Sequence, residues 1–188
     1  MRERVLDAAE KMVQERGLNA VSFQQLADAV GLSKPSVFHH FANKEALAIA
    51  LVDRCQSKYG IEYGDVIDSE SSAPDKLRQI AAIFDRGLRS NRLCLLASLG
   101  QSAVTMGDVV QEDLRLSVTR SIDRYSRVFE QGRREGSLRF EGEPADAAAT
   151  FLALLEGLQV LARSKRDFDL FSRASTSYID SVTRTQDG

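Results

Sequence analysis

The sequence predicts an all-helical protein of about nine helices, in which a small N-terminal domain of three helices precedes a larger helical bundle. Apolar residues recur mostly at steps of three and four positions, the spacing of one helix face, rather than in alternation. Only three prolines occur, at positions 35, 74 and 144. The chain has 188 residues, 43% of them hydrophobic, which suffices for one sizeable core or for a small domain on a larger one.

The first helix is predicted over residues 2–16, where one apolar stripe consists of Val5, Ala9, Met12 and Val13. Gly17 is suited to end this helix. Ser22 and Gln25 have the spacing of a capping box, so a short second helix is predicted over residues 23–30. Gly31 stops it, because glycine readily adopts the left-handed backbone of a tight turn.

A third, very short helix is predicted to begin at Pro35, since a proline in the first turn has no intrahelical N–H bond to lose. Asn43 can cap the fourth helix. That helix is expected to be long, because the apolar spacing continues toward Tyr59 through Leu47, Ala50, Leu51 and Cys55.

The polar stretch "GDVIDSESSAPDK" is predicted to be the main break in the chain, and Pro74 opens the next helix. Further helices are predicted over residues 92–104, 108–135, 144–164 and 168–184. From these elements we expect an N-terminal domain of residues 1–47 and a larger domain of residues 48–188.

The overall charge does not indicate a polyanion partner. The formal net charge is −2, and residues 1–55 hold seven basic and seven acidic residues. No uninterrupted apolar run approaches the roughly 18 residues of a membrane-spanning helix, and the start of the chain has no signal-peptide core. Two cysteines, Cys55 and Cys94, are too few for a disulfide framework. We therefore expect a soluble, cytoplasmic protein with no membrane partner.

The segment "SFQQLADAVGLSKPSVFHHF" has the residues that a helix-turn-helix requires. A small residue at Ala27 lets the two helices approach, and Gly31 provides the turn between them. Leu32 and Val37 can then fix the angle between the helices. In such a unit the second helix projects its polar side into the major groove of DNA.

The longer stretch "VSFQQLADAVGLSKPSVFHHFANKEALAIAL" resembles the DNA-binding segment of the tetracycline-repressor (TetR) family of bacterial transcription regulators. The match runs without gaps from about Val5 to Leu51, and its most specific part consists of Phe38, His40, Phe41 and Lys44. The resemblance implies a homodimer in which residues 1–47 bind DNA and residues 48–188 bind an effector and dimerise. It further implies a repressor that a small molecule releases from its operator.

Carried over position by position, the resemblance places phosphate contacts at Ser22 and at Gln24 or Gln25. The groove would be faced by Ser33, Lys34, Ser36, Val37 and His39, with His40 beside the DNA backbone. Lys44 is predicted at the N-terminus of the fourth helix, where an anion is attracted whatever the family.

Two positions within this DNA-binding set depart from the family pattern. Phe38 stands where tyrosine is usual, so a hydroxyl contact to a phosphate is missing. Pro35 replaces a common glycine, which can change how deeply the helix enters the groove.

The adjacent His39 and His40 do not predict a metal site. Neighbours on a helix diverge and cannot chelate one ion, and no second His or Cys cluster completes a ligand set. Without the motif, ordinary surface histidines at a helical corner would be the simpler interpretation. We expect no cofactor and no enzyme activity, because the chain has no glycine-rich phosphate loop and no Ser-His-Asp set.

Two alternatives to a ligand-released repressor stay open. One is a DNA-binding regulator with no small-molecule effector. The other is a redox or electrophile sensor at Cys94, where Arg92 is close enough to favour a thiolate. A small buried hydrophobic residue is the simpler interpretation of Cys94.

Ten apolar residues of the middle helices are candidates for an effector pocket, although every helix bundle buries such stripes in its core. They are Phe84, Leu88, Leu95, Leu96, Leu99, Met106, Val110, Leu114, Tyr125 and Phe129. Few charged residues converge with them, so an apolar or weakly polar effector is expected.

The last two helices are candidates for the dimer interface. The segment "ATFLALLEGLQVLA" is apolar over more than the one face that its own domain can cover. The interface is predicted to contain Phe151, Leu154, Leu155, Leu158, Leu161, Phe171 and Tyr178. A two-fold dimer sets its reading helices roughly 34–36 Å apart, or a multiple of it, and so requires a near-palindromic operator in double-stranded DNA of the nucleoid.

Overall fold

The computed structural model describes residues 1–184, and these residues are almost entirely helical. They contain ten α-helical segments, two of which are continuous through a π-helical turn, so that nine separate helices result. One isolated bridge, between Leu138 and Thr183, is the strand-like pairing found among the described residues. The predicted all-helical fold is confirmed.

Local sequence signals account for the first four helices. Their bounds are α1 (Arg2–Arg16), α2 (Phe23–Val30), α3 (Lys34–His40) and α4 (Lys44–Arg54), with a 3-10 turn at Leu18–Ala20. The predicted capping box is present, because the N–H of Gln25 donates to Ser22 Oγ at 3.2 Å and the N–H of Ser22 donates to Gln25 Oε1 at 3.0 Å. Asn43 caps α4 by accepting the N–H of Ala46 at 2.8 Å.

The fourth helix runs farther than the predicted break allows. From α4 the chain continues through a π turn (Cys55–Tyr59) into α5 (Gly60–Asp68). Much of the polar stretch predicted as a break is therefore helical. Within this stretch only residues 69–72 are not helical. There Ser72 caps α6 (Ala73–Arg89), whose first turn contains Pro74 as predicted.

The remaining helices are α7 (Leu95–Ala103), α8 (Asp108–Glu135), α9 (Pro144–Lys165) and α10 (Asp169–Val182). α7 is shorter than the predicted helix over residues 92–104. The N–H of Leu93 does not start this helix but donates to the carbonyl oxygen of Gln14 at 3.1 Å.

The chain divides into two compact units. The N-terminal unit comprises residues 1–59 and 92–118, and the C-terminal unit comprises residues 60–91 and the chain from residue 119 onward. The predicted boundary after residue 47 lies inside α4. That residues 1–47 and 48–188 have different functions stays a prediction. In the packing of the chain, the first four helices form one unit with α7 and the start of α8.

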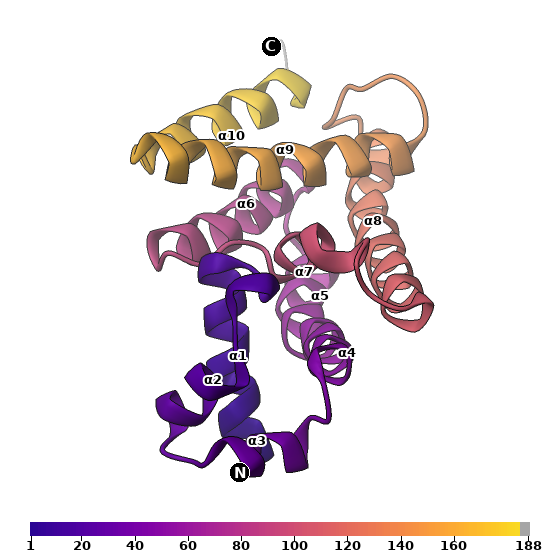
Figure 1. Ribbon diagram of the computed structural model, residues 1–188. Helices are drawn as coiled ribbons and strands as arrows, with labels where there is room; N and C mark the ends of the chain where they lie inside the picture. The colour runs from indigo at the N-terminus through magenta and orange to yellow at the C-terminus, as the bar shows by residue number, and fades with distance from the viewer. Residues whose placement is uncertain (185–188) are drawn as a thin grey trace. The chain divides into compact units, whose positions relative to one another are not determined.

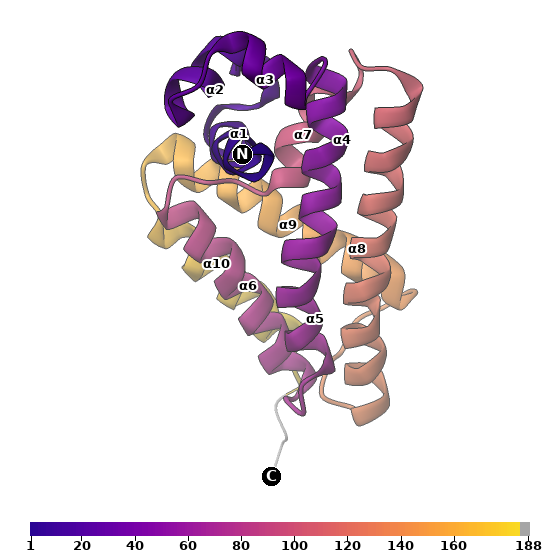
Figure 2. The same ribbon diagram turned by 90° about the horizontal axis from the view of Figure 1, so that it is seen from below.

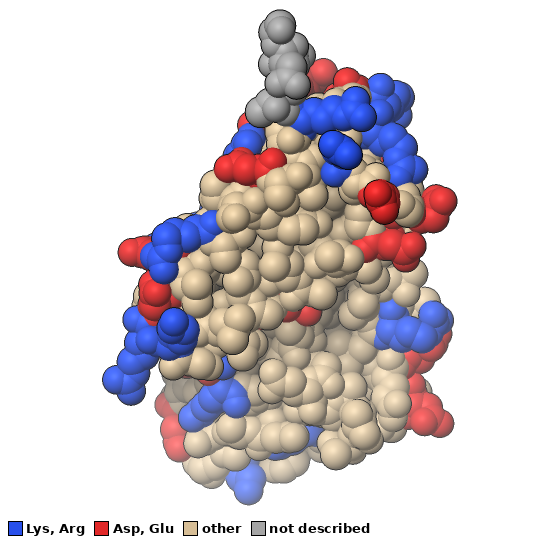
Figure 3. Space-filling model, turned by 90° about the horizontal axis from the view of Figure 1, so that it is seen from above, with Lys and Arg blue, Asp and Glu red and all other residues tan. Residues whose placement is uncertain are grey.

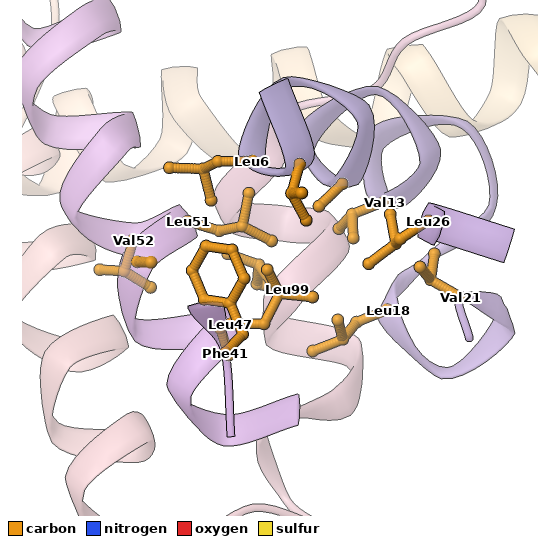
Figure 4. Packing of buried hydrophobic residues seen from close by; sticks show 14 of the residues in the cluster. Leu6, Val13, Leu18, Val21, Leu26, Phe41, Leu47, Leu51, Val52 and Leu99 are labelled. Atoms are coloured by element: carbon orange, nitrogen blue, oxygen red, sulfur yellow. The ribbon is translucent and has the colours of Figure 1, made fainter. Parts of the chain in front are cut away.

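One apolar core holds the N-terminal unit together. Figure 4 shows side chains converging from α1, α2 and α4 and, from a distant part of the sequence, Leu99 of α7. Leu26, Leu47 and Leu51 have no exposed surface, and Leu99 has 1%. Figure 2 shows α1 nearly end-on, and α2 and α3 lie beside it.

Aromatic rings fill the core of the C-terminal unit. Phe151 of α9 lies 6.5 Å from Tyr125 and 6.1 Å from Phe129, measured between ring centroids. Tyr178 of α10 stacks on Phe151 at 5.9 Å. In the same unit α6, α9 and α10 pack against one another (Figure 1).

Among the described helices, α9 alone is long and apolar enough to cross a membrane by length and composition. Its Phe151 and Leu155 are fully buried against the other helices of the C-terminal unit. Core helices of globular domains meet the same criteria, so we assign α9 to the core of its unit.

Candidate nucleic-acid interface

α2 and α3 form a tight helix-turn-helix. Gly31 has a left-handed backbone (φ 69°, ψ 38°), and the N–H of Leu32 donates to the carbonyl oxygen of Ala27 at 2.9 Å. Ala27 is fully buried where the two helices meet. A larger side chain at Ala27 would separate the helices, so the small residue and the turn glycine act as predicted.

The outer side of α3 is exposed and polar. Ser33, Lys34, Pro35 and His39 are exposed, and Ser36 and His40 are half-buried. The Ser33 and Ser36 hydroxyls are 2.8 Å apart, and Ser33 Oγ also accepts the N–H of Ser36 at 3.4 Å. The first turn of α3 is thereby fixed while its lysine and histidine side chains stay available.

Contrary to the prediction, Val37 does not face the groove, because its side chain has no exposed surface. Successive residues on a helix point in different directions, so Val37 packs into the core while its neighbours on both sides lie outward. Its other predicted role, fixing the angle between α2 and α3, agrees with this burial.

Phe38 lies at the edge of the exposed, polar side of α3. Its ring is 4.7 Å from the ring of Phe23 in α2, and the side chain remains 45% exposed. Lys34 Nζ lies 5.9 Å from the Phe38 ring centroid, over its face. The exposed ring edge can contact a sugar or a thymine methyl but cannot donate to a phosphate.

The residues at the start of α2 already take part in local hydrogen bonds. Ser22 and Gln25 form the capping box, and Gln25 Oε1 also accepts from Arg16 at 3.4 Å. Gln24 Nε2 donates to Asp28 Oδ1 at 2.8 Å. All three predicted phosphate contacts are exposed, and the Ser22 hydroxyl can still donate outward because its oxygen is the capping acceptor.

Lys44 occupies the first position of α4, at the helix N-terminus as predicted. Its ammonium donates to the carbonyl oxygens of Leu18 and Asn19 at 3.4 and 3.2 Å. Both contacts are long, and an ammonium has three donors, so one remains for an anion.

Two arginines that the motif does not include lie against this surface. Arg4 donates to the carbonyl oxygen of Val30, at the end of α2, at 3.0 Å. The guanidinium of Arg2 lies over the ring of Phe41 with its central carbon 5.0 Å from the ring centroid. The only sequence signal for them is the basic start of the chain, "MRER", which carries no indication of where it folds.

A known protein family matches the part of the chain that contains this helix-turn-helix. The family described as "Bacterial regulatory proteins, tetR family" matches residues 5–51, the span of α1 through most of α4. Residues 5–51 carry the DNA-binding domain of the TetR family. The chain is therefore a DNA-binding transcriptional regulator.

The similarity to TetR-family proteins extends beyond the reading helices. The HTH-type transcriptional repressor NemR of Escherichia coli is 27% identical over 182 residues, which cover 92% of this chain and 89% of NemR. A TetR-family regulator from Agrobacterium tumefaciens superposes with a TM-score of 0.91 at 21% identity, over 97% of each chain. The reduced form of E. coli NemR superposes with a TM-score of 0.82 at 23% identity, over 100% and 99%. These structures support the fold of the whole chain.

The predicted pocket residues do not form one group. Leu95, Leu96, Leu99, Val110 and Leu114 belong to the core of the N-terminal unit, and Met106 is packed against that core. Phe84, Leu88, Tyr125 and Phe129 are buried in the C-terminal unit. The sequence could not separate the two sets, because both are apolar stripes of middle helices.

The predicted dimer residues are divided in a similar way. Phe151, Leu155 and Phe171 have no exposed surface and Leu158 has 7%, so the prediction that these four form an interface is wrong. Leu154 and Tyr178 are half-buried, and Leu161 is 55% exposed. The stripe chosen from the sequence is the side of α9 that packs within its own unit.

The two histidines and two cysteines form no further site among the described residues. The rings of His39 and His40 lie edge to face with centroids 5.6 Å apart, and no group of His, Cys, Asp or Glu in residues 1–184 is arranged to hold a metal ion. Cys55 is buried, and Cys94 is half-buried at the start of α7.

Proposed function

We propose that this chain is a repressor that binds a near-palindromic operator as a homodimer and is released by a small-molecule effector. The orientation of α3 supports this proposal most strongly, because Val37 lies on its buried side while Lys34 and His39 lie outward. A helix so oriented can enter the major groove with its polar side first. Such a regulator would act on the bacterial chromosome, in the cytoplasm.

In this proposal the exposed and half-buried polar side chains of the helix-turn-helix and the start of α4 have two roles. His39, Lys34 and Ser36 read base edges, because they lie on the outer side of α3. Ser22, Gln24, Gln25, His40 and Lys44 contact phosphates and fix the position of the unit on the duplex. Ser33 and Pro35 shape the first turn of α3, and Phe38 supplies an apolar contact.

The proposed dimer uses the outer side of α9 rather than the predicted stripe. Its exposed positions are spaced at three and four residues and include Ala153, Gly157, Val160 and Leu161. Val160 and Leu161 are 45% and 55% exposed. Figure 3 shows that the face carrying α9 and α10 has mostly uncharged atoms across its middle, with charged side chains toward its edges. Small residues beside exposed valine and leucine suit close packing against a second copy.

The effector is proposed to bind among the aromatic rings of the C-terminal unit. Tyr63 lies 6.0 Å from Phe84 and 5.6 Å from Tyr125 between centroids, so a continuous aromatic cluster extends from α5 to α9. Aromatic walls favour a flat, apolar or weakly polar molecule. Only the C-terminal members of the predicted pocket are retained in this proposal.

A selection experiment tests the proposal. The purified protein is used to enrich bound duplexes from a random pool, and we expect a near-palindrome whose half-sites are separated by about one helical turn or a multiple of it. Enriched duplexes with no shared sequence would contradict specific binding by α3.

The same duplexes then test the effector. Operator affinity is measured with and without fractions of a bacterial metabolite extract, and at least one fraction should weaken binding. If no fraction does so, the alternative of a regulator without a small-molecule effector holds instead.

Cys94 supports a second candidate, a thiol-based sensor. It is half-buried rather than fully enclosed, and it stands at the N-terminus of α7. Rapid labelling of Cys94 in the folded protein, together with loss of operator binding, would favour this candidate. Slow labelling would identify Cys94 as a packing residue.

A further inference from the structure

The chain passes between its two units at three points. It leaves the N-terminal unit after Tyr59, returns at Arg92 and leaves again after Val118. These connections are the covalent routes by which a change in the C-terminal unit can reach the reading helices. Each connection is held within the N-terminal unit by a hydrogen bond.

The first connection ends on a buried polar cluster of α1. Tyr59 Oη donates to Glu10 Oε1 at 2.7 Å and accepts from Gln14 Nε2 at 3.0 Å. Glu10 and Gln14 are 3% and 5% exposed. Lys58 Nζ also donates to Glu10 Oε1, at 2.8 Å, so two consecutive residues at the end of the unit are tied to one carboxylate.

The second connection is attached to the same turn of α1. The N–H of Leu93 donates to the carbonyl oxygen of Gln14, which lies in the last turn of the helix and has no intrahelical partner of its own. The third connection is held by a longer contact, from Gln56 Nε2 to the carbonyl oxygen of Ser117 at 3.5 Å. Gln56 belongs to the π turn that ends at Tyr59.

The π turn makes the first connection sensitive to register. A π turn holds one more residue than an α-helical turn, and such turns are frequent at functional sites. Converting Cys55–Tyr59 to α-helical register would rotate the Tyr59 side chain by about 100° around the helix axis, away from Glu10. The hydrogen bond to Glu10 and the π turn therefore depend on each other.

We infer that Glu10, Gln14 and Tyr59 form a latch that fixes two of the three connections to one turn of α1, and that opening this latch lowers operator affinity. The inference deepens the proposed function and rests on it, because it states how a signal from the C-terminal unit reaches α3. Glu10 and Tyr59 are positioning residues in this account, since neither lies on the outer side of α3.

Two further properties of the cluster agree with a latch. Burial, and after it the hydrogen bond and negative charge of Glu10, raise the pKa of the Tyr59 hydroxyl, which therefore remains a donor even at pH values where an exposed tyrosine ionises. The side-chain oxygen of Gln14 is buried and accepts no hydrogen bond from the described residues. A buried polar atom left unpaired in this way weakens the closed form.

A double-mutant cycle on the full chain tests the latch. Tyr59→Phe removes the hydroxyl, Glu10→Met removes its acceptor, and a third variant combines both changes. Glu15→Met is the matched control, because Glu15 lies on the same helix with its side chain 29% exposed, against 4% for Glu10. Operator affinity is measured at several salt concentrations, and backbone hydrogen exchange is followed by mass spectrometry.

Each single variant should weaken operator binding about tenfold or more. The double variant should be no weaker than Glu10→Met alone, because that change already removes the Tyr59 contact, together with the contacts of Lys58 and Arg54 to the same carboxylate. The salt dependence should not change, since no phosphate contact is lost. Exchange should accelerate about tenfold at residues 55–60 and at Leu93 but not at the centre of α1. Glu15→Met should match the unaltered protein in every measurement.

Additive losses, or faster exchange throughout the N-terminal unit, would show that the cluster only stabilises the fold and would overturn the latch. Unchanged operator affinity in Tyr59→Phe would overturn it as well. If the unaltered protein selects no operator, the proposed function itself fails. That outcome is distinguishable, because it appears before any variant is compared.

Discussion

The ring of Phe23 in α2 packs against the ring of Phe38 in α3, with centroids 4.7 Å apart. This contact fixes an exposed aromatic side chain beside the polar residues of the reading helix. Phe38→Tyr would add a hydroxyl at the ring edge without disturbing the packing on Phe23. We expect operator affinity to rise severalfold and the salt dependence to stay the same, because a neutral hydroxyl displaces no counterion. Weaker binding by Phe38→Tyr would place the ring edge against an apolar part of the DNA.

Substitution of Lys44 distinguishes a phosphate contact from a contact to base edges. Lys44→Ala should weaken binding to all duplexes alike and reduce the salt dependence by about one unit of slope, because one phosphate contact is lost. His39→Ala should instead relax selection at one base-pair position. Thermal unfolding of Lys44→Ala is the control, since its ammonium also contacts the carbonyl oxygens of Leu18 and Asn19. Unchanged affinity at every salt concentration would exclude Lys44 from the interface.

Burial of Val37 predicts a loss of stability rather than of specificity. Val37→Ala would leave a cavity in the core of the N-terminal unit and should lower its free energy of unfolding by about 2 kcal/mol. The sequence preference of the DNA that still binds should not change. Denaturant unfolding and a repeated selection measure the two effects. A changed base preference with unaltered stability would indicate that Val37 contacts the DNA groove.

The outer side of α9 is tested by Leu161→Arg. A charge there would be buried at the proposed interface, so we expect monomers with normal helical content and little operator binding. Ile61→Arg is the matched control, because Ile61 of α5 is 66% exposed in the same unit and lies outside the proposed interface. Sedimentation velocity distinguishes the outcomes. A dimeric Leu161→Arg would mean that the copies associate elsewhere.

Tyr59 also predicts how stability depends on pH. Its pKa in the folded protein is raised above the value of about 10 that an exposed tyrosine has. The stabilisation is therefore fully present below about pH 10 and is lost as the pH rises further, because the unfolded chain releases its proton first. Between pH 8 and pH 11 the free energy of unfolding should fall more steeply for the unaltered protein than for Tyr59→Phe. Parallel curves would contradict this assignment.

Short-range signals predicted the helices well, because caps and turns depend on neighbouring residues. Ser22, Gly31 and Asn43 mark ends that the structure reproduces. Two features needed longer-range information. Leu99 packs with the reading helices rather than in the C-terminal unit, and no local pattern reveals that partner. α9 is apolar on both sides, so its sequence could not show whether Phe151 or Leu161 faces outward.

Within the candidate site, the helical pattern predicted which residues share α3 but gave Val37 two incompatible positions. Burial decides between them. The polar cluster of Glu10 and Tyr59 was not predicted, because these residues are 49 positions apart and meet only through a π turn that no sequence signal marks.

Reading of DNA by α3 is tested by comparing two duplexes under one condition. Binding to the selected operator and to a random duplex of equal length is measured by fluorescence anisotropy at physiological salt, first with the unaltered protein and then with His39→Ala. We expect the unaltered protein to prefer the operator by about a thousandfold or more, and His39→Ala to reduce this preference by about tenfold or more while its random-duplex affinity stays the same. Equal affinity for both duplexes, or an undiminished preference in His39→Ala, would contradict reading of DNA by α3.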